Sequence, residues 1–180
     1  MGLEIPEQPF YKTRFFHRIV GDYRLVKAKD WRVDFGCLVS TDFYFCRALV
    51  LADGNKVGLA HILPNADPQT YLASMLTAFP QRENVRVGIV QADWQYHFNL
   101  ELLCQEQGLH VLTTVRSPIF YDDKWEINRS NPRDVLIHSN GTMKIIEWSN
   151  REYNERNEKI PKMISPRLYT MSLFDTPIIL

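Results

Sequence analysis

The sequence predicts one α+β domain built from β-hairpins and helices. Three observations support this prediction: Asp53-Gly54 and Asn140-Gly141 each lie between β-rich runs, and Asp67-Pro68 begins a helical stretch. Asp-Gly and Asn-Gly are the strongest short-range signals for a two-residue type I′ hairpin turn. Asp followed by Pro is typical of a helix N-terminus. Hairpins mixed with helices favour an α+β architecture.

The apolar and turn-forming residues predict the elements in chain order. We expect an extended, Pro-containing arm over residues 1–13, an aromatic-rich strand over 15–25 interrupted at Gly21-Asp22, a strand over 33–39, and the first hairpin over 46–63. These are followed by a helix over 67–79, a buried strand over 85–91, a helix over about 97–107 that ends at Gly108, a strand over 109–115 and the second hairpin over 135–148. Gly is the usual residue of a left-handed helix C-cap.

The chain divides into a folded part and a C-terminal extension. Residues 1–150 contain the arm and every predicted helix and hairpin, whereas residues 151–180 form a polar connector and a tail. The connector, around residues 149–159, is too polar to join a core, but residues 168–180 are rich in Leu, Ile, Met and aromatic side chains. We expect the tail to pack on the domain or to add an edge strand, because exposing it would leave a large apolar patch in water.

Composition and charge exclude several kinds of partner. The chain has 180 residues with 21 Lys+Arg and 21 Asp+Glu, so its formal net charge is zero. Without a basic excess there is no electrostatic attraction to a phosphate backbone or to an anionic membrane. No apolar stretch approaches about 18 residues, and the N-terminus lacks the apolar region of a signal peptide. We therefore expect a soluble, cytoplasmic protein with no nucleic-acid or membrane partner; delivery as a secreted effector is left open.

The cysteines argue against a disulfide framework and a metal site. The chain has three of them, Cys37, Cys46 and Cys104, which are widely spaced and form no C-x-x-C pair. An odd number at such spacing fits neither a disulfide scaffold nor a zinc site. The sequence therefore predicts free thiols, no metal and no cofactor.

Cys46 and His61 lie near opposite ends of the first hairpin. In a two-residue hairpin centred on Asp53-Gly54 they pair directly across the ladder, with their Cβ atoms about 4.5–5.5 Å apart on one face. An imidazole beside a thiol lowers the pKa of the cysteine and supplies the nucleophilic thiolate. The same His can later protonate a leaving amine. This geometry predicts a cysteine nucleophile and its proton carrier.

Other turns would change this geometry. A three-residue loop over 53–55 would place the two side chains on opposite faces of the sheet. A Gly54-Asn55 turn would keep them on one face, but diagonal to each other. Cys and His are also common as packing residues with no chemical role. The spacing of Cys46 and His61 leaves these alternatives open.

The residues of both hairpins resemble the chemoreceptor glutamine deamidase (CheD) family. The matching segments are residues 46–53 (CRALVLAD), 58–64 (GLAHILP) and 133–141 (RDVLIHSNG), and the order of elements follows the family over about residues 19–148. The resemblance implies mixed β-sheets packed as a sandwich with flanking helices. This cysteine hydrolase fold is similar to that of the cytotoxic necrotizing factor deamidase toxins and the N-terminal asparagine amidohydrolases.

The resemblance also implies a reaction and its residues. In the family a Cys–His pair hydrolyses carboxamides without a cofactor, and a Thr or Ser about six residues before the nucleophile supports the His. Ser40 is at that position here, and Thr41 is next to it. We therefore expect a catalytic site made of Cys46, His61 and one of these two hydroxyls. The expected substrate is a protein-bound Gln or Asn side chain, in a chemotaxis-related or effector role.

One departure from the family bears directly on activity. Tyr44-Phe45 stand where the family has Gly-Ser, just before the nucleophile. Small residues at that point allow a close backbone approach around the oxyanion site. Two alternatives therefore accompany the deamidase hypothesis: a catalytically silent protein-interaction module of the same fold, and a small-molecule amidase.

Overall fold

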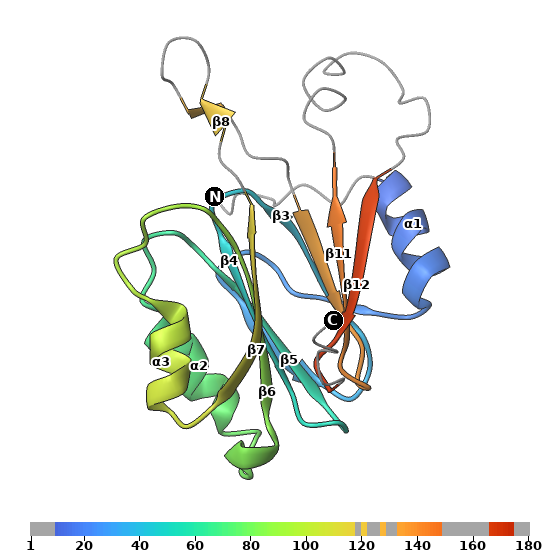
Figure 1. The fold of residues 1–180 in the computed structure, drawn as a ribbon. Helices are drawn as coiled ribbons and strands as arrows, with labels where there is room; N and C mark the ends of the chain where they lie inside the picture. Colours follow the sequence, from blue (N-terminus) through green and yellow to red (C-terminus); the bar gives the residue numbers. More distant parts are fainter. Residues whose placement is uncertain (1–9, 118–119, 122–126, 129–132, 149–165, 175–180) are drawn as a thin grey trace, which may run out of the picture.

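The structure is a computed structural model that describes residues 10–117, 120–121, 127–128, 133–148 and 166–174 (Figure 1). The first sheet has the strand order β1 (Arg24–Leu25), β3 (Leu38–Phe43), β10 (Arg133–Ile137), β11 (Thr142–Glu147) and β12 (Arg167–Ser172). The second has the order β2 (Trp31–Asp34), β5 (Val57–Ile62), β4 (Arg47–Ala52), β6 (Arg86–Ala92) and β7 (His110–Ser117). The smaller elements are α1 (Phe10–Val20), α2 (Pro68–Leu76), the 3₁₀ turn η1 (Arg82–Asn84), α3 (Leu100–Glu106), β8 (Phe120–Tyr121) and β9 (Ile127–Asn128).

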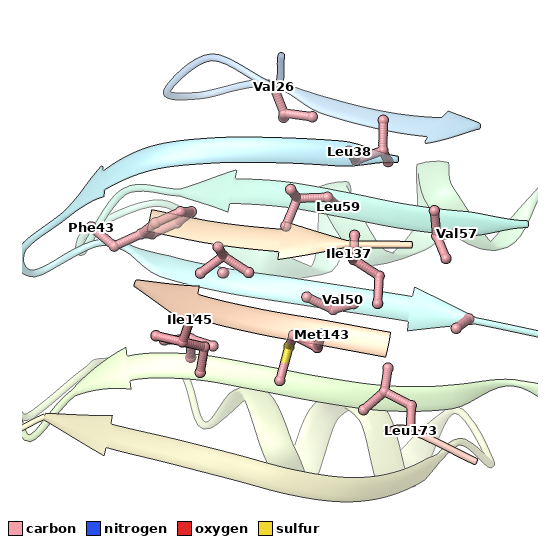
Figure 2. Packing of buried hydrophobic residues seen from close by; sticks show 14 residues of the cluster. Val26, Leu38, Phe43, Val50, Val57, Leu59, Ile137, Met143, Ile145 and Leu173 are labelled. Atoms are coloured by element: carbon pink, nitrogen blue, oxygen red, sulfur yellow. The ribbon is translucent and has the colours of Figure 1, made fainter. Parts of the chain in front are cut away.

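The two large sheets pack face to face, with helices on both outer faces. Side chains of both sheets fill the space between them, among them Leu38 and Ile137 from the first sheet and Val50 and Leu59 from the second (Figure 2). Apolar side chains of α2 and α3 cover the outer face of the second sheet. On the outer face of the first sheet, Phe16 of α1 packs in a third cluster. This α+β sandwich with flanking helices is the predicted architecture.

The central strands show why this layering follows from the sequence. All six residues of β4 and all six of β5 are buried, because each strand has the other sheet on one face and helices on the other. Such strands are continuous apolar runs rather than alternating ones. Gly58 lets α2 lie close to β5, since a Cβ atom there would come within 2.6 Å of the Met75 side chain.

The predicted elements between the two hairpins are confirmed. Asp67 caps α2 by accepting a hydrogen bond from the Gln69 N–H at 2.9 Å. The strands β6 and β7 pair in parallel on either side of α3 in the chain. Gly108 follows α3 with φ +73°, the left-handed conformation expected of a C-cap glycine. The helix begins later than predicted, because Asn99 is its N-cap.

The N-terminal predictions are wrong. Residues 10–20 form the helix α1 rather than an arm and a strand. Phe16 is buried and Phe15, Ile19 and Val20 are partly buried against the same cluster. These positions recur with the helical period, and burial of that face outweighs the strand preference of aromatic and β-branched residues. Residues 1–9 lie outside the described residues.

The strand predicted over residues 33–39 is in fact divided between two sheets. The chain leaves the second sheet after β2 and enters the first at β3, with residues 35–37 between them. Phe35 in this connection is 74% exposed. A run of residues that looks like one strand in the sequence therefore contributes to one strand in each of the two sheets.

The C-terminal tail adds the strand β12 to an edge of the first sheet. β12 pairs antiparallel with β11, and Leu173, directly after it, is fully buried between the sheets. This is the arrangement expected of the apolar tail. The connector around residues 149–159 and the last residues, 175–180, lie outside the described residues. No helix in the described part of the chain is long and apolar enough to cross a membrane.

Both hairpins have turns that differ from the predicted type I′. The first is centred on Gly54-Asn55, with φ +94° at Gly54 and no positive φ at Asn55, which is the pattern of a type II′ turn. Asp53 instead directly follows β4, and its carboxylate accepts the N–H groups of Asn55 and Lys56 at 3.0 Å. The second hairpin has a longer loop in which Gly141 has φ +81° and donates to the His138 carbonyl at 2.8 Å.

Candidate active site

The hairpin register places Cys46 and His61 on one face, but not directly opposite each other. His61 pairs with Ala48, and Cys46 lies two residues earlier, immediately before β4. The predicted direct pairing is therefore wrong, and the diagonal arrangement of the Gly54-Asn55 alternative is the one observed. Diagonal neighbours are about 7–8 Å apart between Cα atoms, within reach of long side chains. Cys46 is partly buried against the cluster between the sheets.

Ser40 fixes the tautomer of His61. The Ser40 hydroxyl donates its proton to the Val26 carbonyl at 2.7 Å, and its oxygen lies 2.9 Å from Nδ1 of His61. Because that one hydroxyl proton is already used, Ser40 must accept from Nδ1–H. Nε2 then carries the lone pair, and it is buried without a hydrogen-bond partner among the described residues. A neutral imidazole held in this way has its basic nitrogen available.

Thr41 lies beside Ser40 but does not reach the imidazole. Its hydroxyl donates to the Asp42 carboxylate at 3.0 Å. Of the two hydroxyls that the sequence left as alternatives, the structure therefore brings Ser40, and not Thr41, to His61.

A bulge in β3 aims two side chains at His61. Ser40 and Phe43 are three positions apart in β3, yet they face residues only two positions apart in β10. Asp42, which has φ +64°, lies in this bulge. As a result Ser40 and Phe43 both point toward the second sheet, where an unbroken strand would send them to opposite faces. The Phe43 ring stacks on the imidazole with centroids 3.9 Å apart.

A buried charge network holds this bulge in place. Asp134 lies in β10 opposite the bulge, is fully buried, and accepts the Asp42 backbone N–H at 2.9 Å. Lys12 of α1, also fully buried, donates to Asp42 at 2.9 Å and to Asp134 at 3.2 Å. Trp148 donates its indole N–H to the second oxygen of Asp134 at 2.6 Å. These bonds stabilise a conformation at Asp42 that non-glycine residues rarely adopt.

A second strained backbone residue bonds to the main chain of His61. Lys29 has φ +67°, and Asp42 and Lys29 are the two non-glycine residues with positive φ among those described. The Lys29 N–H donates to the His61 carbonyl at 3.0 Å, and the His61 N–H donates to the Asp30 carbonyl at 3.0 Å. Strained backbone persists where the surroundings enforce it, and it is concentrated at functional sites. Here one strained residue bonds to the backbone of His61, and the other lies in the bulge between Ser40 and Phe43, whose side chains contact the imidazole.

Burial sets the charge state of the pair. It lowers the pKa of His61 to about 4, against the opposing attraction of the Asp42 carboxylate. It raises the pKa of the Cys46 thiol to about 11. The expectation that the imidazole would lower the pKa of Cys46 is therefore wrong for the free protein, because loss of solvation dominates. At neutral pH both groups are uncharged.

An aromatic segment after β6 lies beside Cys46. The Phe45 ring makes an edge contact with Trp94, and the Tyr96 hydroxyl donates to the Phe45 carbonyl at 2.9 Å. The Arg47 guanidinium lies 4.6 Å from the centre of the Tyr96 ring. The sequence gives no sign of these contacts, because residues about 50 positions apart carry no local signal for meeting.

Within the described residues, no group of three or more His, Cys, Asp or Glu side chains could hold a metal ion. The polar groups near Cys46 and His61 include the Ser40 hydroxyl, the Asp42 carboxylate and the Phe45 carbonyl, and such groups suit proton transfer. No protein-family model matches the chain, and no significant match was found among curated proteins.

Proposed function

We propose that this protein is a cysteine-dependent amidohydrolase that hydrolyses a carboxamide side chain. The observation that supports this most is the state of His61: Nδ1 is held by Ser40 at 2.9 Å, and Nε2 is buried without a partner among the described residues. Nε2 belongs to a side chain on the same face as Cys46. Nucleophilic catalysis requires a basic nitrogen within hydrogen-bond reach of the thiol, so the proposed reaction needs a side-chain rotation that brings Cys46 Sγ to the unpartnered Nε2.

The first half of the proposed reaction forms a thioester. His61 Nε2 takes the thiol proton as Cys46 Sγ attacks the carbonyl carbon of the carboxamide, which gives a tetrahedral oxyanion. When the C–N bond breaks, the imidazolium returns that proton to the leaving nitrogen, and ammonia departs. The substrate is then an acyl group on Cys46.

The second half releases the product. His61 removes a proton from water as the water oxygen attacks the thioester carbonyl. The C–S bond then breaks, the thiolate of Cys46 regains a proton from the imidazolium, and the product leaves as a carboxylic acid. The balance is one amide and one water converted into one acid and one ammonia, with no redox step and no cofactor.

The pKa values favour coupled proton transfer over a preformed ion pair. A thiol pKa of about 11 and an imidazole pKa of about 4 keep both groups neutral until substrate arrives. The imidazolium that forms during attack keeps its Nδ1–H bond to Ser40, and the nearby Asp42 carboxylate stabilises its charge. Ser40 and Asp42 stabilise His61 more strongly when the imidazole is charged, as it is during the attack on the substrate. Stabilisation that is stronger in the transition state than in the ground state lowers the activation barrier.

The substrate proposed is a Gln or Asn side chain on a protein. Cys46 is partly exposed, so a carboxamide carried on another surface can approach it. A formal net charge of zero provides no long-range steering of a charged small molecule. The resemblance to the deamidase family of residues 46–64 and 133–141 supports the same substrate class.

The test is ammonia release from Gln- and Asn-containing proteins and peptides. Each conversion also raises the substrate mass by about one dalton, because –NH₂ becomes –OH. We expect the wild type to give both signals and Cys46→Ala to give neither, with Cys104→Ala as the control thiol variant of full activity. Ammonia release by Cys46→Ala at the wild-type rate would eliminate the proposal.

A protein-interaction module is the second candidate. Trp94 and Phe98 are 38% and 43% exposed, and Phe45 packs on Trp94 just before Cys46. Exposed aromatic side chains are enriched where proteins bind one another. A wild type that binds a protein partner through these residues, yet releases no ammonia from it, would favour this candidate.

A further inference from the structure

A tyrosine hydroxyl lies between two strands next to the candidate nucleophile. The β4–β6 ladder ends at the pair Ala48 and Val90. Beyond that pair, the Tyr96 hydroxyl accepts the Ala92 N–H at 3.1 Å and donates to the Phe45 carbonyl at 2.9 Å. The hydroxyl therefore links the end of β6 to the peptide that joins Phe45 to Cys46.

This link determines where the Cys46 backbone N–H points. No peptide bond among the described residues is cis, so the peptide between Phe45 and Cys46 is trans. In a trans peptide the C=O and N–H groups point in opposite directions. Because Tyr96 holds the Phe45 carbonyl, it also fixes the direction of the Cys46 N–H.

The residues on both sides of Cys46 are attached to the same segment. The Phe45 ring contacts Trp94 with centroids 5.5 Å apart. Arg47, fully buried, stacks on the Tyr96 ring and donates to the Phe98 carbonyl at 2.7 Å. Cys46 thus lies between two residues that the segment 94–98 holds in place.

Fixed donors are what the proposed reaction needs at this point. When sulfur attacks a carboxamide, negative charge develops on the carbonyl oxygen beside the nucleophile. Backbone N–H groups stabilise that charge most when their orientation is set before the reaction. Small residues before the nucleophile would let the backbone pack closely, but here the bulky Tyr44-Phe45 pair occupies those positions.

We propose that Tyr96 is a positioning residue: its hydroxyl orients the Phe45–Cys46 peptide so that the Cys46 N–H binds the oxyanion. The inference rests on the proposed function and adds to it the residue that organises the oxyanion site. Tyr96 does not take part in proton transfer in this scheme. Its effect is confined to the step in which charge develops on the substrate.

The substitution Tyr96→Phe isolates the hydroxyl. The ring remains in place to stack on Arg47, so the segment keeps its largest contact. We expect kcat for ammonia release to fall roughly 10- to 100-fold with little change in KM, because the lost interaction strengthens only in the transition state. A peptide aldehyde, which forms an oxyanion when Cys46 adds to it, should lose affinity by a similar factor.

Two controls separate positioning from general damage. Alkylation of Cys46 by iodoacetamide forms no oxyanion, so its rate and pH dependence should match the wild type in Tyr96→Phe. The matched variant Tyr23→Phe removes a tyrosine hydroxyl in the cluster on the outer face of the first sheet, where the Tyr23 ring contacts Phe16. It should keep the wild-type kcat and aldehyde affinity.

Each outcome decides between the proposals. An active wild type whose kcat and aldehyde affinity are unchanged by Tyr96→Phe would overturn the positioning role and leave the proposed function intact. Equal losses in ammonia release and in alkylation would also overturn it, since that result indicates a disturbed Cys46 rather than a misplaced N–H. A wild type that neither releases ammonia nor binds aldehydes would overturn both.

Discussion

At the scale of single residues, one hydroxyl decides which nitrogen of His61 carries the proton. The Ser40 hydroxyl donates its proton to the Val26 carbonyl and accepts a hydrogen bond from Nδ1–H of His61. The unprotonated Nε2 is therefore the basic nitrogen of the imidazole. Ser40→Ala removes that acceptor and allows the other tautomer. We predict a loss of roughly 10- to 100-fold in kcat, smaller than the full contribution of a general base because His61 itself remains in place.

Thr41→Ala is the matched control for Ser40. Thr41 is its neighbour in β3, but its hydroxyl bonds to Asp42 and not to the imidazole. It should therefore keep kcat close to the wild-type value. Steady-state ammonia release measures both variants, and a larger loss in Thr41→Ala than in Ser40→Ala would contradict the assignment of the orienting hydroxyl.

Burial of His61 makes stability depend on pH. Its folded-state pKa of about 4 is below the ordinary value of 6.5, so the unfolded chain binds the extra proton between these values. The contribution of neutral His61 to the free energy of unfolding is fully present above pH 6.5 and is lost as the pH falls toward 4. The 2.5-unit difference corresponds to about 3 kcal/mol.

The comparison of wild type with His61→Gln isolates this effect. Burial, outweighing the attraction of Lys12, raises the pKa of Asp134 to about 6, which acts in the opposite direction over a similar pH range. Both proteins contain Asp134, so the difference between their unfolding free energies cancels its contribution. Urea unfolding from pH 4 to 7.5 should show the wild type losing more stability on acidification; parallel curves would indicate that His61 is solvated.

At the scale of elements, the bulge in β3 and the helix α1 form one unit. Lys12 is the buried cation between Asp42 and Asp134. Lys12→Met leaves Asp134 buried without that partner, which typically costs about 3–5 kcal/mol. Thermal or urea unfolding should show this loss. Arg18→Met on the exposed side of α1 should stay within about 0.5 kcal/mol.

The Lys12 variant also bears on the candidate site. If the network holds the bulge, Lys12→Met should weaken the stacking of Phe43 on His61 and lower kcat even where the protein remains folded. A variant as stable and as active as the wild type would show that the bulge needs no cation.

Local signals predicted the elements between the hairpins, and non-local contacts produced the rest. Asp67 at the start of α2 and Gly108 after α3 act through neighbouring backbone groups, so the sequence shows them directly. Lys12 and Asp134 are 122 positions apart, and no local pattern predicts their contact or the helix that depends on it. The same holds for Tyr96 and Phe45.

The candidate site was partly predictable for the same reason. Cys46 and His61 belong to one hairpin, so their shared face followed from the turn alternatives, while the choice among turns depended on how Asp53 bonds to the backbone. Ser40 and Thr41 could not be separated, because the residue that faces His61 depends on how β3 packs in the sandwich and on the bulge that follows.

At the scale of the whole molecule, the segment around β12 contributes a side chain to the core between the two sheets. Leu173 follows β12 and is fully buried between the sheets, whereas Leu168 in β12 is 46% exposed. Leu173→Ala should cost about 2–5 kcal/mol, the usual range for a buried Leu. Leu168→Ala should cost less than about 0.5 kcal/mol. Equal effects in urea unfolding would show that the tail does not contribute to the core.

The sandwich also explains why the site joins a partly exposed thiol to a buried imidazole. The imidazole of His61 is buried between the sheets, supported by Ser40 and Phe43 of the first sheet, while Cys46 lies just before β4 and is partly exposed. A partly exposed nucleophile, Cys46, with a buried base, His61, suits a carboxamide that is carried on the surface of another protein. The two sheets must therefore stay packed for the base to keep its orientation.

In the proposed mechanism, a carboxamide substrate acylates Cys46, and His61 acts as the base. The most direct measurement is intact-protein mass spectrometry after mixing a reactive Gln or Asn peptide with the wild type and quenching in acid. We expect a species heavier by the peptide mass minus about 17 daltons, the mass of the departed ammonia. Peptide mapping should place it on Cys46, and His61→Ala should not form it. Ammonia release without any adduct on Cys46, or an adduct on another residue, would contradict the account.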